Sequence, residues 1–251
     1  MKYLKYFKTD ADYQNYIKSD DFVTPNVSYV EDTNIVHYKP YDLIIMTSKS
    51  NPKVMEVCYN QGWAASPDEM YASEAAKVTS IGTAFENLGN RDSASGDSGS
   101  NISFTFSFDE FKYFTGVTSI VKDAFYGSNI VSITIPDSVT SIGGRAFYNC
   151  SSLTSITIPD SVTSIEKNAF KNCSSLTSIT IPDSVTSIGE YVFNGCSKLN
   201  EIICFATTAP SIWGTTFTGL NSYGTLRIPA GSDYSSWKDS LGFRWTTEEI
   251  Q

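Results

Sequence analysis

Residues 153–175 read LTSITIPDSVTSIEKNAFKNCSS, and this unit decides the fold. Two further copies flank it without a gap, at residues 130–152 and 176–198. The first two copies are identical at 17 of 23 positions, and the last two at 16 of 23. A short fixed period of this kind indicates stacked structural units that share one core, and it argues against an enzyme built around a pocket.

Each copy predicts a strand, a turn and a short helical turn. In the central copy, Ile156 and Ile158 alternate with hydroxyl residues, as in a strand with one buried face. Pro159 and Asp160 then favour a turn, because proline fixes φ and aspartate can bond backbone amides. Stacked coils are expected to align Ile156 with Ile133 and Ile179, and Phe170 with Phe147 and Phe193. One coil cannot bury these faces by itself, so the core must run through the stack.

The array extends beyond its near-identical copies. Residues 117–125 repeat the second half of the unit, and residues 78–85 carry a fainter copy. Residues 199–205 begin a further coil that then loses the pattern. Degenerate end units are typical of solenoids, because terminal coils must cover an exposed core edge.

The pattern L-x-x-I-x-I-P-x-S-V-x-x-I-G-x-x-A-F-x-x-C resembles the leucine-rich repeats of bacterial BspA-type surface proteins. The resemblance is clear over residues 117–205, and residues 225–231 with Tyr234 and Trp237 are similar to the segment that often ends such arrays. It implies an α+β repeat fold: a short leucine-rich repeat solenoid of 23-residue coils with a parallel strand face, an N-terminal α/β region and an irregular C-terminal cap. It also implies an adhesive or protein-binding surface role, without specifying the ligand.

Four regions are expected along the chain. Residues 1–45 form a small unit with a helix over 10–18 and a hairpin of strands 26–30 and 34–38. Residues 46–110 form an N-terminal cap region, helical over 54–85, with a flexible loop at 89–101 that is rich in Gly, Ser and Asp. Residues 111–206 form the solenoid and residues 207–251 the C-terminal cap. The first unit is too small to be very stable by itself, so we expect it to pack on a neighbour or on another copy of the chain.

The composition excludes several partners. With 18 basic against 27 acidic residues the net charge is −9, so nucleic acid and anionic membrane surfaces are not expected partners. No stretch is apolar for long enough to insert into a membrane, and the first residues have no apolar core of a signal peptide.

The cysteines are expected to be structural. Cys150, Cys173 and Cys196 recur with the period of the array and are interpreted as a column of small buried hydrophobes, and Cys204 takes the inward position of Ile181. Their number, five, is odd and their spacing does not indicate a disulfide framework. We expect no metal site and no cofactor, since no second type of metal ligand accompanies them.

No catalytic residues are expected. The single histidine, His37, lies in a predicted strand without a nucleophile motif nearby. The aspartates at the repeated turn are interpreted as backbone caps rather than as acid–base groups: Asp137, Asp160 and Asp183.

Two sets of residues are candidates for binding. The first is the outward strand face, which is either a binding surface or a solvated face: Ser132, Thr134, Ser155, Thr157, Ser178, Thr180 and Glu201. The second is a set of aromatic residues, which form either a platform for sugars or proteins or, as we favour, a hydrophobic lid on the last coil: Trp213, Tyr223, Tyr234, Trp237 and Trp245. The variable triplets 143–145, 166–168 and 189–191, with Tyr148 and Lys171, are expected to be exposed.

Two functions remain open. The first is a non-enzymatic adhesion module at a cell surface or outside the cell, which presents the repeat surface to a protein or glycan. The second is a structural or receptor-binding component of a phage tail fibre or similar appendage, in which residues 1–45 mediate assembly into a homo-oligomer. The family resemblance favours the first, and the lack of a signal sequence in this chain favours the second, with a virion or appendage as its location.

Overall fold

The computed structural model describes residues 6–7, 28–31, 35–38, 44–47, 49–89, 104–242 and 244–250. The chain divides into two compact units, Met1–Ile44 and Ile45–Gln251. In the first unit, β1 (Tyr6–Phe7), β2 (Ser28–Glu31) and β3 (Ile35–Tyr38) form one sheet in which β2 and β3 pair antiparallel, as the alternating segments predicted. The helix expected over residues 10–18 and nearly all of the loop expected over 89–101 lie outside the described residues.

The second unit begins with a small α/β segment. Its elements are β4 (Ile44–Thr47), α2 (Pro52–Asn60), β5 (Glu69–Tyr71) and α3 (Ala72–Ala75), and β4 pairs with β5. The helix expected over residues 54–85 is therefore wrong beyond Asn60, except for the single short helix α3. Gly62 adopts a φ of +72° and its amide donates to the Tyr59 carbonyl at 2.9 Å, which ends α2 in the way that a left-handed glycine ends many helices.

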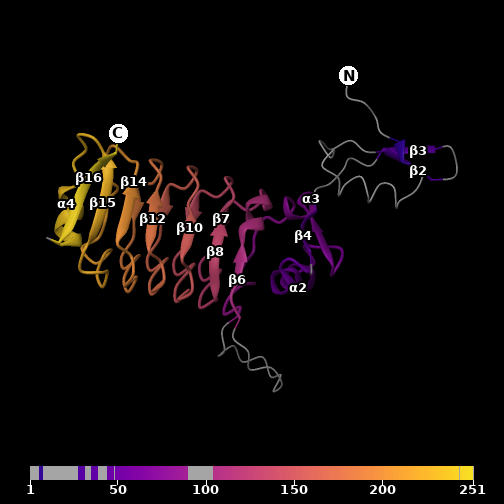
Figure 1. Cartoon of the computed structure of the whole chain (residues 1–251), viewed down its shortest axis with the longest axis horizontal. Helices are drawn as coiled ribbons and strands as arrows, with labels where there is room; N and C mark the ends of the chain where they lie inside the picture. The colour runs from indigo at the N-terminus through magenta and orange to yellow at the C-terminus, as the bar shows by residue number, and fades with distance from the viewer. Residues whose placement is uncertain are drawn as a thin grey trace, which may run out of the picture. The chain divides into compact units, whose positions relative to one another are not determined.

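The rest of the second unit is a parallel β-solenoid whose successive coils lie side by side (Figure 1). One side of each coil contributes a strand of three to six residues, and these strands pair only in parallel in the described part. One hydrogen-bonded group comprises β6 (Phe106–Phe108), β8 (Ile130–Thr134) and β10 (Ser155–Thr157). The next comprises β12 (Ser178–Ile181), β14 (Glu201–Cys204), β15 (Gly224–Pro229) and β16 (Trp245–Ile250).

A second, narrower sheet runs along another side of the solenoid. It comprises β7 (Ser119–Ile120), β9 (Ser141–Ile142), β11 (Ser164–Ile165) and β13 (Ser187–Ile188), all parallel. Ser187 adds a bridge to Ser211, so the following coil continues this side. A 3₁₀ helix, η1 (Asp109–Tyr113), follows β6 and buries Phe111.

A column of stacked phenylalanines runs through the core on the third side. Neighbouring rings lie 5.0 to 5.9 Å apart between centroids and are within 14° of parallel. The column comprises Phe85, Phe125, Phe147, Phe170, Phe193 and Phe217. The predicted alignment of Phe147, Phe170 and Phe193 is confirmed, and the faint copy at residues 78–85 is a structural coil.

The backbone hydrogen bonds between coils run in both directions. On the sheet sides some amides donate to the preceding coil, as Thr163 does to the Thr140 carbonyl at 2.9 Å, and others to the following coil, as Ile188 does to the Ser211 carbonyl at 2.9 Å. On the phenylalanine side they donate to the following coil, as Phe147 does to the Ala169 carbonyl at 2.8 Å. Each coil is thus hydrogen-bonded to both neighbours, which satisfies its backbone polar groups.

The hydroxyls of the repeat also bind the preceding coil. The Thr163 hydroxyl donates to the Thr140 carbonyl at 3.2 Å, and the Ser161 hydroxyl donates to the Val139 carbonyl at 2.6 Å. The backbone-capping role expected for Asp137, Asp160 and Asp183 is wrong: all three are exposed, and in the described part of the chain their carboxylates form no hydrogen bond. The serine that follows each aspartate is the residue that ties the turn to its neighbour.

The cysteine column is buried, as predicted. Cys150, Cys173 and Cys196 have no exposed surface, and all five cysteines are free thiols. The Cys173 thiol donates to the Phe147 carbonyl at 3.1 Å, and its two counterparts make the same contact one coil away. Burial raises the pKa of the Cys150 thiol to about 12, against 9.0 for an ordinary thiol.

The first prediction concerns the phenylalanine column. Phe170 is fully buried, so Phe170→Ala should lower the free energy of unfolding by about 3–5 kcal/mol in a urea titration. Phe205→Ala is the matched control, because Phe205 is 48% exposed and its loss should cost less than about 1 kcal/mol. A loss below about 1 kcal/mol for Phe170→Ala would show that the column does not carry the core.

The second prediction concerns the thiols. At pH 8, less than about one thiol equivalent per native chain should react with a disulfide reagent, because burial excludes the reagent and disfavours the thiolate form. In guanidinium chloride all five should react. Rapid reaction of two or more native thiols would contradict the buried column.

Candidate functional site

The seven residues predicted on the outer strand face lie on the outside of the main sheet. Ser155 pairs with Ser132 and Thr157 with Thr134, while Ser178 pairs with Glu201, so the hydroxyls form two rows across the strands. Ser155, Thr157 and Thr180 are exposed, and the other four are partly covered. The Ser132 hydroxyl donates to Asp109 Oδ1 at 3.3 Å, which ties the face to η1.

Beyond β12 the character of this face changes from hydroxyl to charged. Arg227 of β15 lies between two carboxylates, with Nε 3.3 Å from Glu201 Oε1 and 3.3 Å from Glu248 Oε2. All three side chains are at least 36% exposed, so water screens these ion pairs and each contributes little to stability. The sequence interpretation missed Arg227 and Glu248, because it did not align residues 225–231 in register with the earlier strands and Glu248 lies beyond the repeats.

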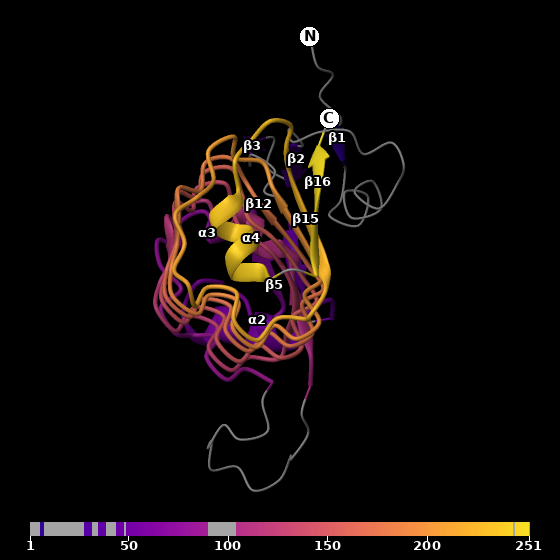
Figure 2. The same cartoon turned by 90° about the vertical axis from the view of Figure 1, so that its left-hand side faces the viewer.

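Three of the five candidate aromatic residues are buried and do not form a surface platform. Tyr234 is 1% exposed, Trp237 is fully buried and Trp245 is 8% exposed. Trp237 packs on Phe217 with ring centroids 5.1 Å apart, and its indole nitrogen donates to the Pro210 carbonyl at 2.9 Å. Figure 2 shows α4 (Ser235–Leu241), which carries Trp237, lying across the open end of the last coils. These three residues cover the end of the core, as expected for a hydrophobic lid on the last coil.

The Tyr234 hydroxyl lies inside this lid. It donates to the Ala206 carbonyl at 2.7 Å and lies 3.0 Å from Cys204 Sγ. Burial raises the pKa of the Tyr234 phenol well above its usual range, and the adjacent Cys204 thiol adds to the shift. Tyr234 is therefore a neutral structural group.

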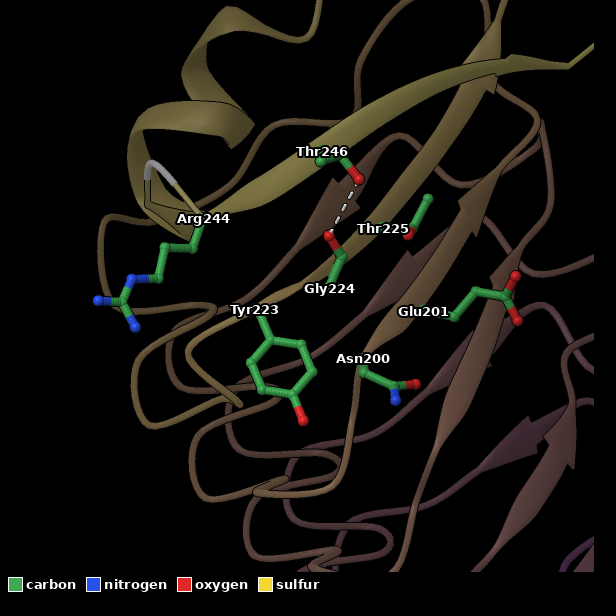
Figure 3. A pocket seen from close by; sticks show the side chains of 7 residues that line it. All are labelled: Asn200, Glu201, Tyr223, Gly224, Thr225, Arg244 and Thr246. Atoms are coloured by element: carbon green, nitrogen blue, oxygen red, sulfur yellow. Dashed lines mark hydrogen bonds between the residues drawn. The ribbon is translucent and has the colours of Figure 1, made fainter.

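The other two aromatic residues are exposed. Trp213 is 60% and Tyr223 is 61% exposed, the largest fractions among the large hydrophobic residues that the structure describes. Tyr223 borders a groove where the strands β14, β15 and β16 begin. The groove is lined by Asn200, Glu201, Tyr223, Gly224, Thr225, Arg244 and Thr246. Figure 3 shows the Tyr223 ring between Arg244 on one side and Asn200 and Glu201 on the other.

The exposure of Tyr223 departs from the repeat. Leu176 and Leu199 each stand three residues before a buried strand residue, Ile179 and Ile202, and both leucines are fully buried. Tyr223 stands three residues before the equivalent Leu226, which pairs with Ile202, yet its ring lies outside.

Trp245 explains why Tyr223 lies outside. Trp245 pairs with Gly224 in the sheet, and its indole nitrogen donates to the Asn221 carbonyl at 3.2 Å. A Cβ on Gly224 would lie 2.7 Å from the Trp245 ring and 2.7 Å from the Asn200 carbonyl oxygen, so only glycine allows this packing. The Trp245 ring thus packs beneath the start of β15, and we attribute the outward position of Tyr223 to it.

Polar groups around Tyr223 are left without partners. The Asn200 carboxamide and the Thr225 hydroxyl form no hydrogen bond within the described residues. Two coils earlier, Thr154 stands in the place of Asn200, and its hydroxyl donates to the Val131 carbonyl at 3.1 Å. The groove therefore holds hydrogen-bonding groups that the stacking of coils does not use.

The variable triplets lie on a different side and form a row of cations and tyrosines. The Arg145 guanidinium lies 4.6 Å from the centroid of Tyr126 and 5.4 Å from that of Tyr148, and Lys171 Nζ lies 5.1 Å from that of Tyr191. The last residue of each triplet is left-handed, with φ of 60° at Arg145, 60° at Asn168 and 55° at Tyr191. The expected exposure of the variable triplets, with Tyr148 and Lys171, is wrong except at Glu166 and Lys167: Gly143 is buried and the others are partly covered. The cause is contact between neighbouring coils, as in the Lys167–Glu190 ion pair and the hydrogen bond from the Gly144 amide to Glu166.

Other kinds of site are not found in the described part. No group of three or more His, Cys, Asp or Glu residues there could hold a metal ion. Within the same residues, no helix has the length and apolar character that spanning a membrane requires.

Residues 118–236 match the family model described as BspA type leucine rich repeat region, in six copies. This part of the chain is a BspA-type leucine-rich repeat region, and the fold expected from the sequence is confirmed. No curated protein matches the chain.

Several solved structures of bacterial leucine-rich repeat proteins are similar to the chain. One from Bacteroides capillosus is 38% identical, with a TM-score of 0.34, and the match covers 35% of this chain and 63% of that protein. A leucine rich cell surface protein from Faecalibacterium prausnitzii is 29% identical, with a TM-score of 0.45 and coverage of 55% and 34%. A T. pallidum leucine-rich repeat protein is 30% identical, with a TM-score of 0.36 and coverage of 46% and 54%. The chain thus spans less than two thirds of each.

The third prediction tests the packing beneath the groove. Gly224→Ala should lower the free energy of unfolding by about 1–3 kcal/mol, because the new methyl group meets backbone and the Trp245 ring. Gly214→Ala is the matched control: nothing lies within 4 Å of its added Cβ, so the change should stay within about 0.5 kcal/mol. Equal effects of the two substitutions in a urea titration would refute the role given to Gly224.

Proposed function

We propose that this chain is a non-enzymatic binding module that acts at a cell surface or outside the cell and recognises a protein or a glycan. The proposal rests on one observation: some of the described polar groups form hydrogen bonds between coils, and others are left without a partner on the surface. The hydroxyls of Ser161 and Thr163 tie coil to coil, whereas other polar side chains are exposed and form no hydrogen bond within the described residues. These are Ser155, Thr157 and Thr180 on the strand face, and Asn200 and Tyr223 at the last coils. Exposed groups held on a rigid scaffold suit recognition of a ligand.

The chemistry of the described residues supports binding over catalysis. The thiols are buried, and the repeated aspartates stand in identical exposed turns without a basic partner among the described residues. Neither arrangement places a nucleophile beside a general base.

The area of the strand face limits the kind of ligand that it can bind. The strand face from β6 to β16 is about 34 Å long and 13 Å wide, from strand spacings of about 4.8 Å and a rise of about 3.3 Å per residue. It therefore presents roughly 440 Å², about half of what one partner buries in a standard protein interface. A protein ligand has to engage neighbouring surfaces as well, such as the row around Arg145 and Tyr148, whereas a glycan fits within the face.

The surface location rests on the repeat region and on one relative. The Faecalibacterium prausnitzii protein is described as a cell surface protein, and the same location for this chain is part of the proposal. The appendage hypothesis and the assembly role of residues 1–45 stay predictions, since most of those residues lie outside the described part.

The fourth prediction tests binding directly. The full chain, labelled at its N-terminus, should bind saturably to at least one member of a panel of immobilised extracellular-matrix proteins and glycans. The bound ligand should be recovered chemically unchanged, as judged by mass spectrometry. A chain that binds no member of the panel, or that cleaves one, would contradict the proposal.

A further inference from the structure

We propose that the groove at the start of β14, β15 and β16 is a binding site for a neutral hexopyranose at the end of a glycan. The inference rests on the proposed binding function and names the ligand class of one site. It starts from Tyr223, which carries an open aromatic face in a position that the repeat otherwise fills with a buried leucine.

The site is built on a fixed base. The three strands that bear it are paired in register, with Glu201 opposite Thr225 and Thr225 opposite Thr246. Gly224 lies against Trp245, and the Thr246 hydroxyl donates to the Gly224 carbonyl at 3.4 Å (Figure 3). The backbone that carries the ring and the polar groups is therefore held in place before any ligand arrives, which reduces the entropy lost on binding.

The groups at the groove match the two kinds of surface on a pyranose. One face of a hexose presents C–H groups, which pack on an aromatic ring, and its rim presents hydroxyls that both donate and accept hydrogen bonds. Tyr223 supplies the ring. The Asn200 carboxamide has a donor and an acceptor side by side, and Thr225 adds a hydroxyl, so vicinal hydroxyls can be bound at two points.

The charges at the groove favour a neutral sugar over an acidic one. Arg244 lines the groove, but so does Glu201. Arg227, which neutralises Glu201, is shared with Glu248, so this cluster carries one net negative charge that balances Arg244. A carboxylated sugar would meet no net positive charge, and the chain as a whole carries −9. One sugar ring against one aromatic residue suggests a Kd on the order of 1 mM, which neighbouring copies on a surface would strengthen through avidity.

The fifth prediction is tested by saturation-transfer NMR on the full chain. The probes are the methyl glycosides of glucose, galactose, mannose and N-acetylglucosamine, with methyl glucuronide as the acidic comparison. At least one neutral glycoside should bind. Tyr223→Ala should weaken it about fivefold or more, while Tyr223→Phe, which keeps the ring, should stay within about twofold. Asn200→Thr, which restores the residue of the earlier coils, should also weaken binding.

Tyr59→Ala is the matched control, because Tyr59 is a 44% exposed tyrosine on α2, away from the groove lining. It should leave binding unchanged, and circular dichroism should show equal folding of all variants. Three results would overturn the inference: no neutral glycoside binds, Tyr223→Ala binds as well as the parent, or only methyl glucuronide binds and added salt weakens it. If the full chain binds a protein from the panel but no glycoside, the site inference fails and the binding function stands. If it binds nothing in either experiment, both fail.

Discussion

Stacking of one coil on the next is the constraint on which the structure depends. A 23-residue coil encloses too little apolar surface to be stable in isolation, so its isoleucines, phenylalanine and cysteine must each meet the same residue of a neighbour. The backbone enforces this register from two directions, since amides on the sheet sides donate to both neighbouring coils and amides on the phenylalanine side donate to the following coil. The apolar side chains of the repeat are committed to that register, and the polar groups left for other purposes lie on the outer strand face and at the last coils.

The periodic part of the fold could be predicted from the sequence because every repeated residue has a local reason. Alternation identified the strands, and the spacing of Phe147 and Phe170 identified the column. The hydrogen bonds at the turn were harder to predict. Asp160 and Ser161 are both capable of capping, and only the structure shows that serine reaches the Val139 carbonyl while aspartate points to solvent. Continuation of the sheet through β16 was not predicted, because residues 245–250 lie beyond the repeats, although they pair in parallel with β15.

The groove escaped prediction for a related reason. Tyr223 stands where a leucine stands in earlier coils, so the period suggests a core residue, and Trp245 lies more than twenty residues further on. Trp245, not Tyr223, fills the space beside Gly224, which has no side chain. This outcome depends on the packing of segments far apart in the sequence. The sequence did carry one signal: the pair Tyr-Gly in place of Leu-Thr, where glycine removes bulk just beside an aromatic residue.

The equivalence of the coils has a consequence for the length of the array. Residues 130–152, 153–175 and 176–198 present nearly the same contacts to the coil before and the coil after. Removing one unit, or adding another, would rejoin matching surfaces and leave both end caps and the last strands as they are. The length of the solenoid can then change in steps of about 4.8 Å per unit. Recombination within the gene can thus change the number of coils without altering either end cap.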